Sequence, residues 1–372
     1  MVASSKRPGA RTMPGRCLPV VHGPREYAVP NEDTGCDLWS RDMTRHRKMR
    51  RPPRQTNHKG GERRVGVELE FASISARACA EIVRQCYGGR IEEEDPHRLF
   101  VRETPFGDFT CELDTQYAHR PYGEAAKGPE EDAFSGFRAE MRRIYGDISS
   151  LIVPCEIVAP PIELSRLEEL ETLVDALVHA GASGTKSSPF YAFGTQLNPE
   201  IATEEADWIT AVIKAYLLVS DWLRAVIEID GTRQFAAFAE PFPPAYVNRV
   251  VAPHYWPGME RLIDDYLVDN PTRNRELDLL PLFMELDGDR VRRVVRDLRV
   301  AARPTFHYRL PDANLGDPEW DLMLEWNRWC VVEELAEKRD VLDRMGQAYI
   351  ANNERLLPRE WSVLASEWLV LS

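Results

Sequence analysis

The sequence predicts an α+β fold, in which an antiparallel-rich sheet cradles the functional site and helices pack on the sheet's other face. Several short segments alternate apolar and polar residues, which is the period of a strand that buries one face. Helical segments of unequal length and irregular position separate them, unlike the regular strand–helix order of a parallel sheet. One face of the sheet would then carry no helices, and the polar residues of the strands would line it.

The clearest strand is RRVGVELEFA at residues 63–72. Apolar side chains stand at every second position from Val65 to Phe71. The same alternation places Glu68 and Glu70 together on the opposite face, two residues apart. The strand by itself leaves two interpretations open, because these carboxylates are either ordinary charges on a solvated sheet face or one part of a site.

Further strands and helices follow in chain order. An amphipathic helix at 75–89 should end at Gly88 and Gly89, and Pro160 and Pro161 should stop a later strand. The other expected elements are paired strands at 97–103 and 108–114, a buried strand at 151–162, a helix at 165–181, a strand at 190–199, a helix after Thr203, a strand at 303–312 and a helical, Trp-rich region at 318–370. Residues 118–147, rich in Gly, Pro and charge, are expected to form an insert.

Residues 1–62 form a basic leader that is rich in Arg, Pro and Gly and lacks an apolar period. Up to Arg64 the chain carries 15 Lys or Arg and 6 Asp or Glu, whereas the remainder carries 32 and 54. We expect the leader to be disordered, and an arm that binds an acidic partner or RNA is the alternative. A core domain at 63–312 and a helical extension at 313–372, packed on that core, are expected to follow.

The composition argues against several classes of protein. The acidic body repels phosphate, so only the leader is a candidate for binding nucleic acid. No apolar run approaches the roughly 20 residues of a membrane span, and no apolar signal core stands at the N-terminus. Seven cysteines without a C-x-x-C pair favour reduced thiols in the cytoplasm over a disulfide framework or a structural zinc site.

Chemically active side chains recur on the polar side of successive strands. A charge in the centre of a strand is costly to bury unless it is paired or binds a metal, so the recurrence predicts a site. In chain order the candidates are Glu68 and Glu70, Glu112 and Asp114, Glu156, Gln196 and Asn198, and then Arg303, Thr305, His307 and Arg309.

These residue types favour a magnesium–nucleotide pocket. Clustered carboxylates without His or Cys partners form a hard oxygen site, which suits Mg²⁺ or Mn²⁺ better than Zn²⁺. Arg309 and Arg303 would bind phosphate or carboxylate through the guanidinium fork. The sequence contains neither a G-x-x-x-x-G-K-[ST] loop nor a G-x-G-x-x-G fingerprint after a strand, so phosphate binding would depend on metal and arginine.

Five of these segments resemble the ordered motifs of the amidoligase family. They are GVELEF, CELDTQY, CEIVAPPI, GTQLN and PTFHYRLP, and the resemblance covers residues 63–312. The family belongs to the carboxylate–amine ligase superfamily, with glutamine synthetase and glutamate–cysteine ligase. The resemblance implies a glutamine-synthetase-like catalytic core whose sheet holds ATP and two or more Mg²⁺. It also implies a reaction in which a carboxylate is activated as an acyl phosphate and joined to an amine.

The resemblance assigns roles to residues of this sequence. Glu68 and Glu70 match the metal-binding E-x-E, and Glu156 matches the glutamate of a later strand. Arg309 matches the arginine of the late T-x-E-F-R strand. The full set of candidates is Glu68, Glu70, Glu156 and Glu112 for metal, Arg309, Gln196, Asn198 and Arg233 for ATP or an anionic substrate group, and Arg309, His307 and Arg303 for catalysis.

The sequence departs from the family pattern at three positions. His307 stands where a glutamate is usual, and Gln196 and Asn198 stand where the family often has two histidines. Asp114 falls where many members carry the aspartate of a D-x-S segment. His307 could bind metal, act as an acid–base group or be a shielded structural histidine, and these alternatives stay open.

Other functions remain as alternatives at this stage. A phosphotransferase of the guanidino-kinase type would use a similar fold without making an amide, and a catalytically inactive module would keep the sheet for a ligand or partner. The expected substrates are a small-molecule or peptide carboxylate and an amine, and a homo-oligomer is an open option. The stretch DNPTRNRELDLLPL at 269–282 either binds nucleotide or substrate or supplies caps and turn contacts.

Overall fold

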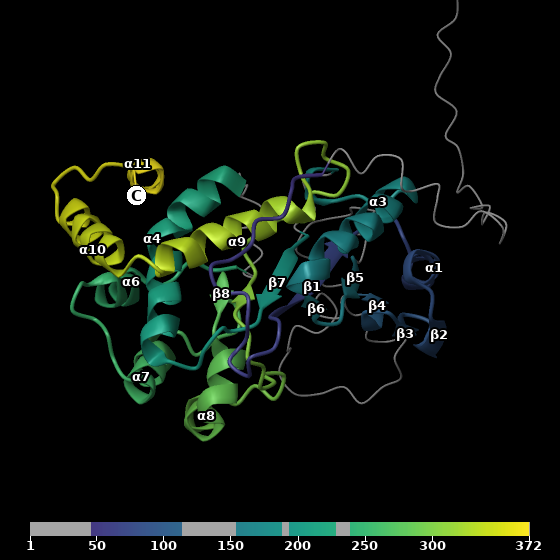
Figure 1. Cartoon of the computed structure of the whole chain (residues 1–372), viewed down its shortest axis with the longest axis horizontal. Coiled ribbons are helices and arrows are strands. Elements are labelled where there is room, and N and C mark those ends of the chain that lie inside the picture. Colours follow the sequence, from purple (N-terminus) through teal and green to yellow (C-terminus); the bar gives the residue numbers. More distant parts are fainter. Residues whose placement is uncertain (1–45, 114–153, 188–192, 228–238, 372) are drawn as a thin grey trace, which may run out of the picture. The chain divides into compact units, whose positions relative to one another are not determined.

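The computed structural model describes residues 46–113, 154–187, 193–227 and 239–371 (Figure 1). These residues form a nine-stranded sheet with helices, and the strand pairs are antiparallel. The predicted α+β class and the antiparallel sheet are therefore confirmed. The described residues all belong to one compact unit that spans 36–372.

The order of strands differs from their order along the chain. Neighbouring strands in the sheet are β2 (Arg90–Asp95), β3 (Arg98–Thr104), β4 (Gly107–Leu113), β5 (Cys155–Val158), β1 (Arg64–Phe71), β7 (Thr195–Pro199), β9 (His307–Tyr308) and β8 (Leu277–Asp278), and β6 (Ile162–Glu163) pairs with one end of β1. The predicted opening strand thus lies inside the sheet, where β5 and β7 flank it. Its buried residues alternate with half-buried ones from Val65 to Phe71, as the sequence predicts.

The apolar face at the β2–β5 end of the sheet is covered by α1 (Ala76–Tyr87), which contacts these strands. Ser75 caps this helix by accepting a hydrogen bond from the backbone N–H of Ala78, and Gly88 ends it in a left-handed conformation (φ 74°). The helix buries Cys79 and Val83 against the strands. The helix predicted at 75–89 is therefore present.

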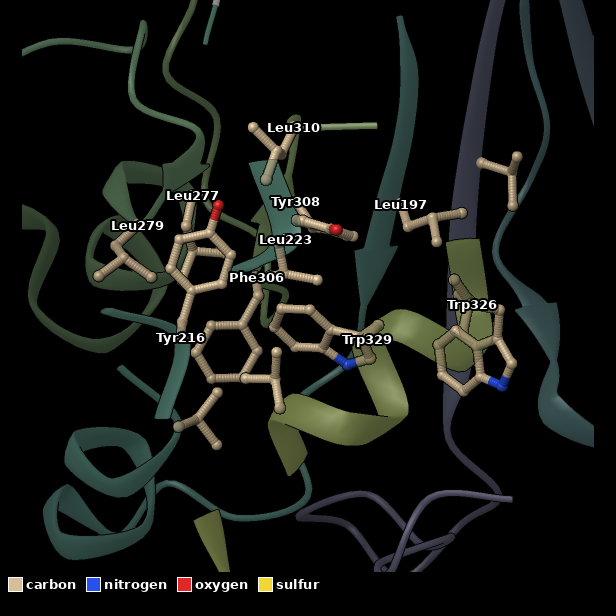
Figure 2. Packing of buried hydrophobic residues seen from close by; sticks show 14 of the residues in the cluster. Leu197, Tyr216, Leu223, Leu277, Leu279, Phe306, Tyr308, Leu310, Trp326 and Trp329 are labelled. Atoms are coloured by element: carbon tan, nitrogen blue, oxygen red, sulfur yellow. The ribbon is translucent and has the colours of Figure 1, made fainter. Parts of the chain in front are cut away.

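The other end of the apolar face is covered by α4 (Ala206–Ile227) and α9 (Leu322–Ala336). Figure 2 shows Tyr216 of α4 and Trp329 of α9 beside Tyr308 of β9. The Tyr308 ring centroid is 5.9 Å from that of Tyr216 and 5.5 Å from that of Trp329. These aromatic contacts fix the face of β9, because Tyr308 points into the core and its neighbours His307 and Arg309 must point to the opposite face.

The remaining described helices surround α4 and the apolar face. They are the 3₁₀ segments η3 (Leu164–Leu170) and η4 (Thr185–Ser187), and the helices α3 (Glu171–His179), α6 (Pro244–Val251), α7 (Met259–Asp269), α8 (Leu280–Val294), α10 (Arg339–Asn353) and α11 (Trp361–Leu371). The pattern of the sequence did not predict β2, β8, α6, α7 and α8. Of the strand expected at 151–162, residues 154–162 are described, and in that range Cys155–Val158 forms β5 and Ile162 begins β6. The strand expected at 303–312 is reduced to the two residues of β9.

Residues 46–62, the second part of the predicted leader, lie along the helical extension. Arg50 pairs with Glu334 at 2.6 Å, and the indole N–H of Trp326 donates to the carbonyl oxygen of Arg50. Arg54 pairs with Glu337 at 2.7 Å. This part of the leader is thus bound to the body, while residues 1–45 and the insert predicted at 118–147 lie outside the described residues.

Among the described helices, none is both long enough and apolar enough to cross a lipid bilayer.

Candidate active site

A row of three glutamates crosses three neighbouring strands on the face opposite the helices. Glu70 of β1 pairs directly with Glu156 of β5, and Glu156 pairs in turn with Glu112 of β4. Directly opposed residues in an antiparallel pair share a face, with Cβ atoms about 4.5–5.5 Å apart. The structure therefore brings together three carboxylates, although Glu70 and Glu156 are more than 80 residues apart in the sequence. Glu156 is 8% exposed.

Glu68 lies beside this row and is held by two amides of β7. Its register partner is Gln196, and both Gln196 Nε2 and Asn198 Nδ2 donate to Glu68 Oε1, at 3.1 and 2.8 Å. Gln196 Nε2 also lies 2.9 Å from Asn198 Oδ1. The two amides that replace the expected histidines thus orient a carboxylate, because their N–H groups donate to it.

Glu70 is oriented by the backbone. The N–H of Gly194 donates to Glu70 Oε2 at 2.8 Å, and the N–H of Glu70 donates to the carbonyl oxygen of Gly194 at 3.1 Å. A charge-assisted hydrogen bond of this kind fixes a carboxylate more firmly than a neutral contact does. The side chain is therefore held facing the open side of the sheet by the start of β7.

Glu112 differs from the other members of the row. Its Oε2 lies 3.0 Å from Arg98 Nε of β3, so it already has a counter-ion. Burial raises the pKa of Glu112 above its usual range, while Arg98 opposes the shift and Glu68 adds to it. The Arg98 pair makes Glu112 the least available of the four metal candidates.

The donor set suits a hard cation, although the described side chains are not gathered around one point. Within the described ranges, no three His, Cys, Asp or Glu side chains are grouped so that they could hold a metal ion together. Three carboxylates on one face, two of them oriented by N–H donors, nevertheless supply the oxygen ligands that Mg²⁺ and Mn²⁺ prefer. Glu68, Glu70 and Glu156 fit such an ion in their residue type and in the sheet face that they share.

His307 continues the polar face beyond the amides. It is 5% exposed, and its Nδ1 lies 3.2 Å from Gln196 Nε2. Burial lowers the pKa of His307 well below its usual range, and the charges of Arg309, Arg303 and Arg273 add to the effect. The ring is therefore neutral at physiological pH, with one of its two nitrogens protonated.

Asp278 is a site residue that the sequence reading missed. It is fully buried on β8, directly opposite His307 of β9. The backbone N–H of Leu280 donates to its Oδ1 at 2.9 Å. Burial raises the pKa of Asp278 to about 6, while Arg309, the Leu280 N–H and Arg273 oppose the shift. The sequence offered one sign of this residue, an aspartate alone within the apolar run LDLLPL. The same run also fits a helix, so it did not single out Asp278.

Three arginines gather around His307. Arg309 is half-buried, Arg303 is exposed and Arg273 is half-buried, and all three charges act on the His307 ring. Burial and the nearby charge of Arg309 lower the pKa of Arg273. Of the stretch 269–282, Arg273 therefore faces the site, whereas Arg275 holds Asn270 and the carbonyl oxygen of Pro241.

Asp114 and Arg233 lie outside the described residues, so their predicted roles stay predictions. The polar face consequently has an acidic part on β4, β5 and β1, a bridge of amides on β7, and a part with arginines, His307 and Asp278 on β9 and β8. Hydrogen bonds from Gln196 to Glu68 and toward His307 join the two parts.

Comparison with protein families gives one match. A family model described as "putative amidoligase enzyme" matches residues 61–331, which include all the described strands and α9 apart from its last turn. None of the curated proteins compared matches this chain.

Proposed function

Since the chain belongs to the amidoligase family, we propose that it is an ATP- and Mg²⁺-dependent ligase that joins a carboxylate to an amine. The observation that supports this most is the division of one sheet face into a row of carboxylates and a group of arginines. Carboxylates can hold metal ions and arginines can hold phosphate, and both are required to handle the triphosphate of ATP. The family membership confirms the resemblance found in the sequence motifs.

Glu68, Glu70 and Glu156 are the residues that would hold the metal. When bound, Mg²⁺ would offset phosphate charge and make the terminal phosphorus easier to attack. The amides of Gln196 and Asn198 keep Glu68 oriented, and the Gly194 N–H does the same for Glu70. Preoriented ligands reduce the reorganisation that the reaction would otherwise need.

Arg309 and Arg303 would stabilise the negative charge that develops on the transferred phosphoryl group. In the first step a carboxylate oxygen of the substrate attacks the terminal phosphorus of ATP, the bond to the bridging oxygen breaks, and ADP leaves. In the second step the amine nitrogen attacks the acyl carbon, the bond to the phosphate oxygen breaks, and inorganic phosphate and one proton are released. Neutral His307, in the tautomer that carries its proton on Nε2, would donate a hydrogen bond to an anionic oxygen.

A screen that identifies products tests this proposal. The full chain is incubated with ATP, Mg²⁺ and combinations of acids and amines, and mass spectrometry identifies the products. We expect an amide together with ADP and phosphate from at least one pair. A phosphorylated acceptor would instead identify a phosphotransferase, and the absence of Mg²⁺-dependent ATP binding would indicate a binding module.

The glutamates are then tested in the reaction that the screen finds. We expect the double variant Glu68→Ala/Glu70→Ala to lose at least about 100-fold in turnover, because one transition-state charge interaction alone contributes about 10²–10³. Glu163→Gln on β6, an exposed glutamate that pairs with Arg64, is the matched control and should keep its activity. Undiminished ligation by a folded Glu68→Ala/Glu70→Ala variant would contradict the proposal.

A further inference from the structure

Buried polar atoms without hydrogen-bond partners gather at the β8–β9 end of the polar face. Within the described part of the chain, Asp278 Oδ2, His307 Nε2, Thr305 Oγ1 and Arg273 Nε are buried and accept or donate no hydrogen bond. Buried polar groups are almost always hydrogen-bonded in native proteins, and each exception requires an explanation. Four such atoms in one neighbourhood indicate that a polar ligand completes this part of the site.

The register places the two most buried of these residues side by side on the same face of the sheet. Asp278 is 0% exposed and His307 is 5% exposed, and the two residues are direct partners in the β8–β9 ladder. Thr305 precedes His307 by two residues and shares its side of the chain. The ionised Asp278 Oδ2 can only accept a hydrogen bond and Arg273 Nε can only donate one, whereas His307 Nε2 donates in the tautomer that carries its proton there. The ligand must therefore both donate a hydrogen bond to Asp278 and accept one from Arg273.

The charges around these atoms restrict the ligand further. Arg273 and Arg309 act on Asp278, so one buried carboxylate lies among guanidinium groups. A phosphate or a simple carboxylate would meet the repulsion of the Asp278 carboxylate, and a simple amine would meet the repulsion of the arginines. A group that carries both signs of charge a few ångströms apart satisfies both.

We propose that the β8–β9 end binds one of the two ligase substrates, and that this substrate is an α-amino acid. Asp278 accepts hydrogen bonds from its ammonium group, and Arg273 and His307 donate to its α-carboxylate. The role of this amino acid as a substrate rests on the proposed ligase function, whereas its binding needs neither ATP nor turnover.

Binding is measured first, in the absence of ATP. Isothermal titration of the full chain with each of the twenty amino acids should find at least one that binds. The tightest is then compared with its α-amide, which lacks the carboxylate, and with its deamino acid, which lacks the ammonium. We expect each analogue to bind at least about tenfold more weakly, because a charge-assisted hydrogen bond contributes about 1.5–3 kcal/mol.

Asp278→Asn is the decisive variant, and we expect it to weaken amino-acid binding at least about tenfold. Asp297→Asn is the matched control, because Asp297 lies in the same surroundings but is already paired with Arg299 at 2.7 Å. Its affinity should stay within about twofold. Arg273→Met, whose side chain is half-buried, provides a second variant if Asp278→Asn fails to fold by circular dichroism.

Three results would overturn the inference. They are the absence of binding by every amino acid, a deamino acid that binds as tightly as its parent, and inorganic phosphate alone that binds the wild type more tightly than any amino acid does. The last result would identify a plain anion site. Failure of the ligase proposal is separate: amino-acid binding that depends on Asp278, with no amide formed in any screen, would refute the ligase and leave this site in place.

Discussion

Two adjacent arginines at the start of β1 have opposite environments. Arg63 is 1% exposed and makes two hydrogen bonds to Glu333 of α9, at 2.7 and 2.6 Å, and it also donates to the carbonyl oxygens of Glu200 and Arg54. Arg64 is exposed and lies 3.4 Å from Glu163. The alternation of the strand sends one side chain toward α9 and the next toward solvent. The two arginines should therefore contribute differently to the free energy of unfolding.

Replacing Arg63 by Met should destabilise the fold by about 3–5 kcal/mol, because it leaves the buried Glu333 carboxylate without its counter-ion. Arg64→Met is the control and should cost less than about 1 kcal/mol, since exposed pairs contribute little. Urea unfolding followed by tryptophan fluorescence measures both free energies of unfolding. Equal midpoints for the two variants would show that the Arg63–Glu333 pair does not hold α9 to the sheet.

At the scale of elements, the close packing of α10 against α6 depends on a glycine. A Cβ atom at Gly346 of α10 would lie 2.0 Å from the carbonyl oxygen of Val251 at the end of α6. Backbone atoms cannot move aside as a flexible side chain can, so α10 packs against α6 only because this position lacks a side chain.

Gly346→Ala should therefore lower the free energy of unfolding by about 1–3 kcal/mol, the usual range for overpacking. Gly288→Ala in α8 is the matched control, because its Cβ would meet only Met284 Sδ at 3.4 Å and alanine favours a helix. Thermal unfolding of both variants tests the contrast. If Gly346→Ala unfolded at or above the wild-type temperature, the described contact between α6 and α10 would be disproved.

The whole molecule carries a buried lysine whose charge should appear in the pH dependence of stability. Lys214 of α4 is 0% exposed, and its Nζ donates to the Ala252 carbonyl oxygen at 2.7 Å. Trp256, 4.3 Å away, and Asp343, 3.6 Å away, also face the ammonium, and Arg339 lies over the same indole. Burial lowers the pKa of Lys214 to about 8, although Asp343 opposes the shift.

Because the folded-state pKa lies below the unfolded value of about 10.4, the unfolded chain binds the proton more tightly. The contribution of Lys214 to stability is therefore fully present above the unfolded pKa and is lost as the pH falls through the folded pKa. Between pH 7.5 and 9.5 the free energy of unfolding of the wild type should rise by about 2 kcal/mol relative to Lys214→Met. Urea titrations of both proteins at several pH values measure this difference. Parallel curves would mean that Lys214 keeps an ordinary pKa.

Much of the candidate site follows from strand alternation. Glu68 and Glu70 had to share a face of the strand. Glu156 stands alone in an apolar strand, so its charge required a paired group or a bound metal. Asp278 was not identified, because β8 has two residues and no period can be read from so short an element. Arg273 lies in the stretch 269–282, for which the sequence left ligand binding and turn contacts as alternatives. The helices α6, α7 and α8 were missed for a related reason, since short amphipathic segments between turns fit more than one interpretation.

The sequence by itself determined the α+β class, the apolar and polar faces of β1 and the ordered motifs of the amidoligase family. These are local properties, because a side chain's face depends on its own strand. Only the tertiary structure decided which strands are neighbours: β1 lies between β5 and β7, and β9 lies between β7 and β8. That order brings together segments far apart in the chain, with β9 packed against α4 and α9 through Tyr308, and it sets Glu156 beside Glu70 and Asp278 opposite His307.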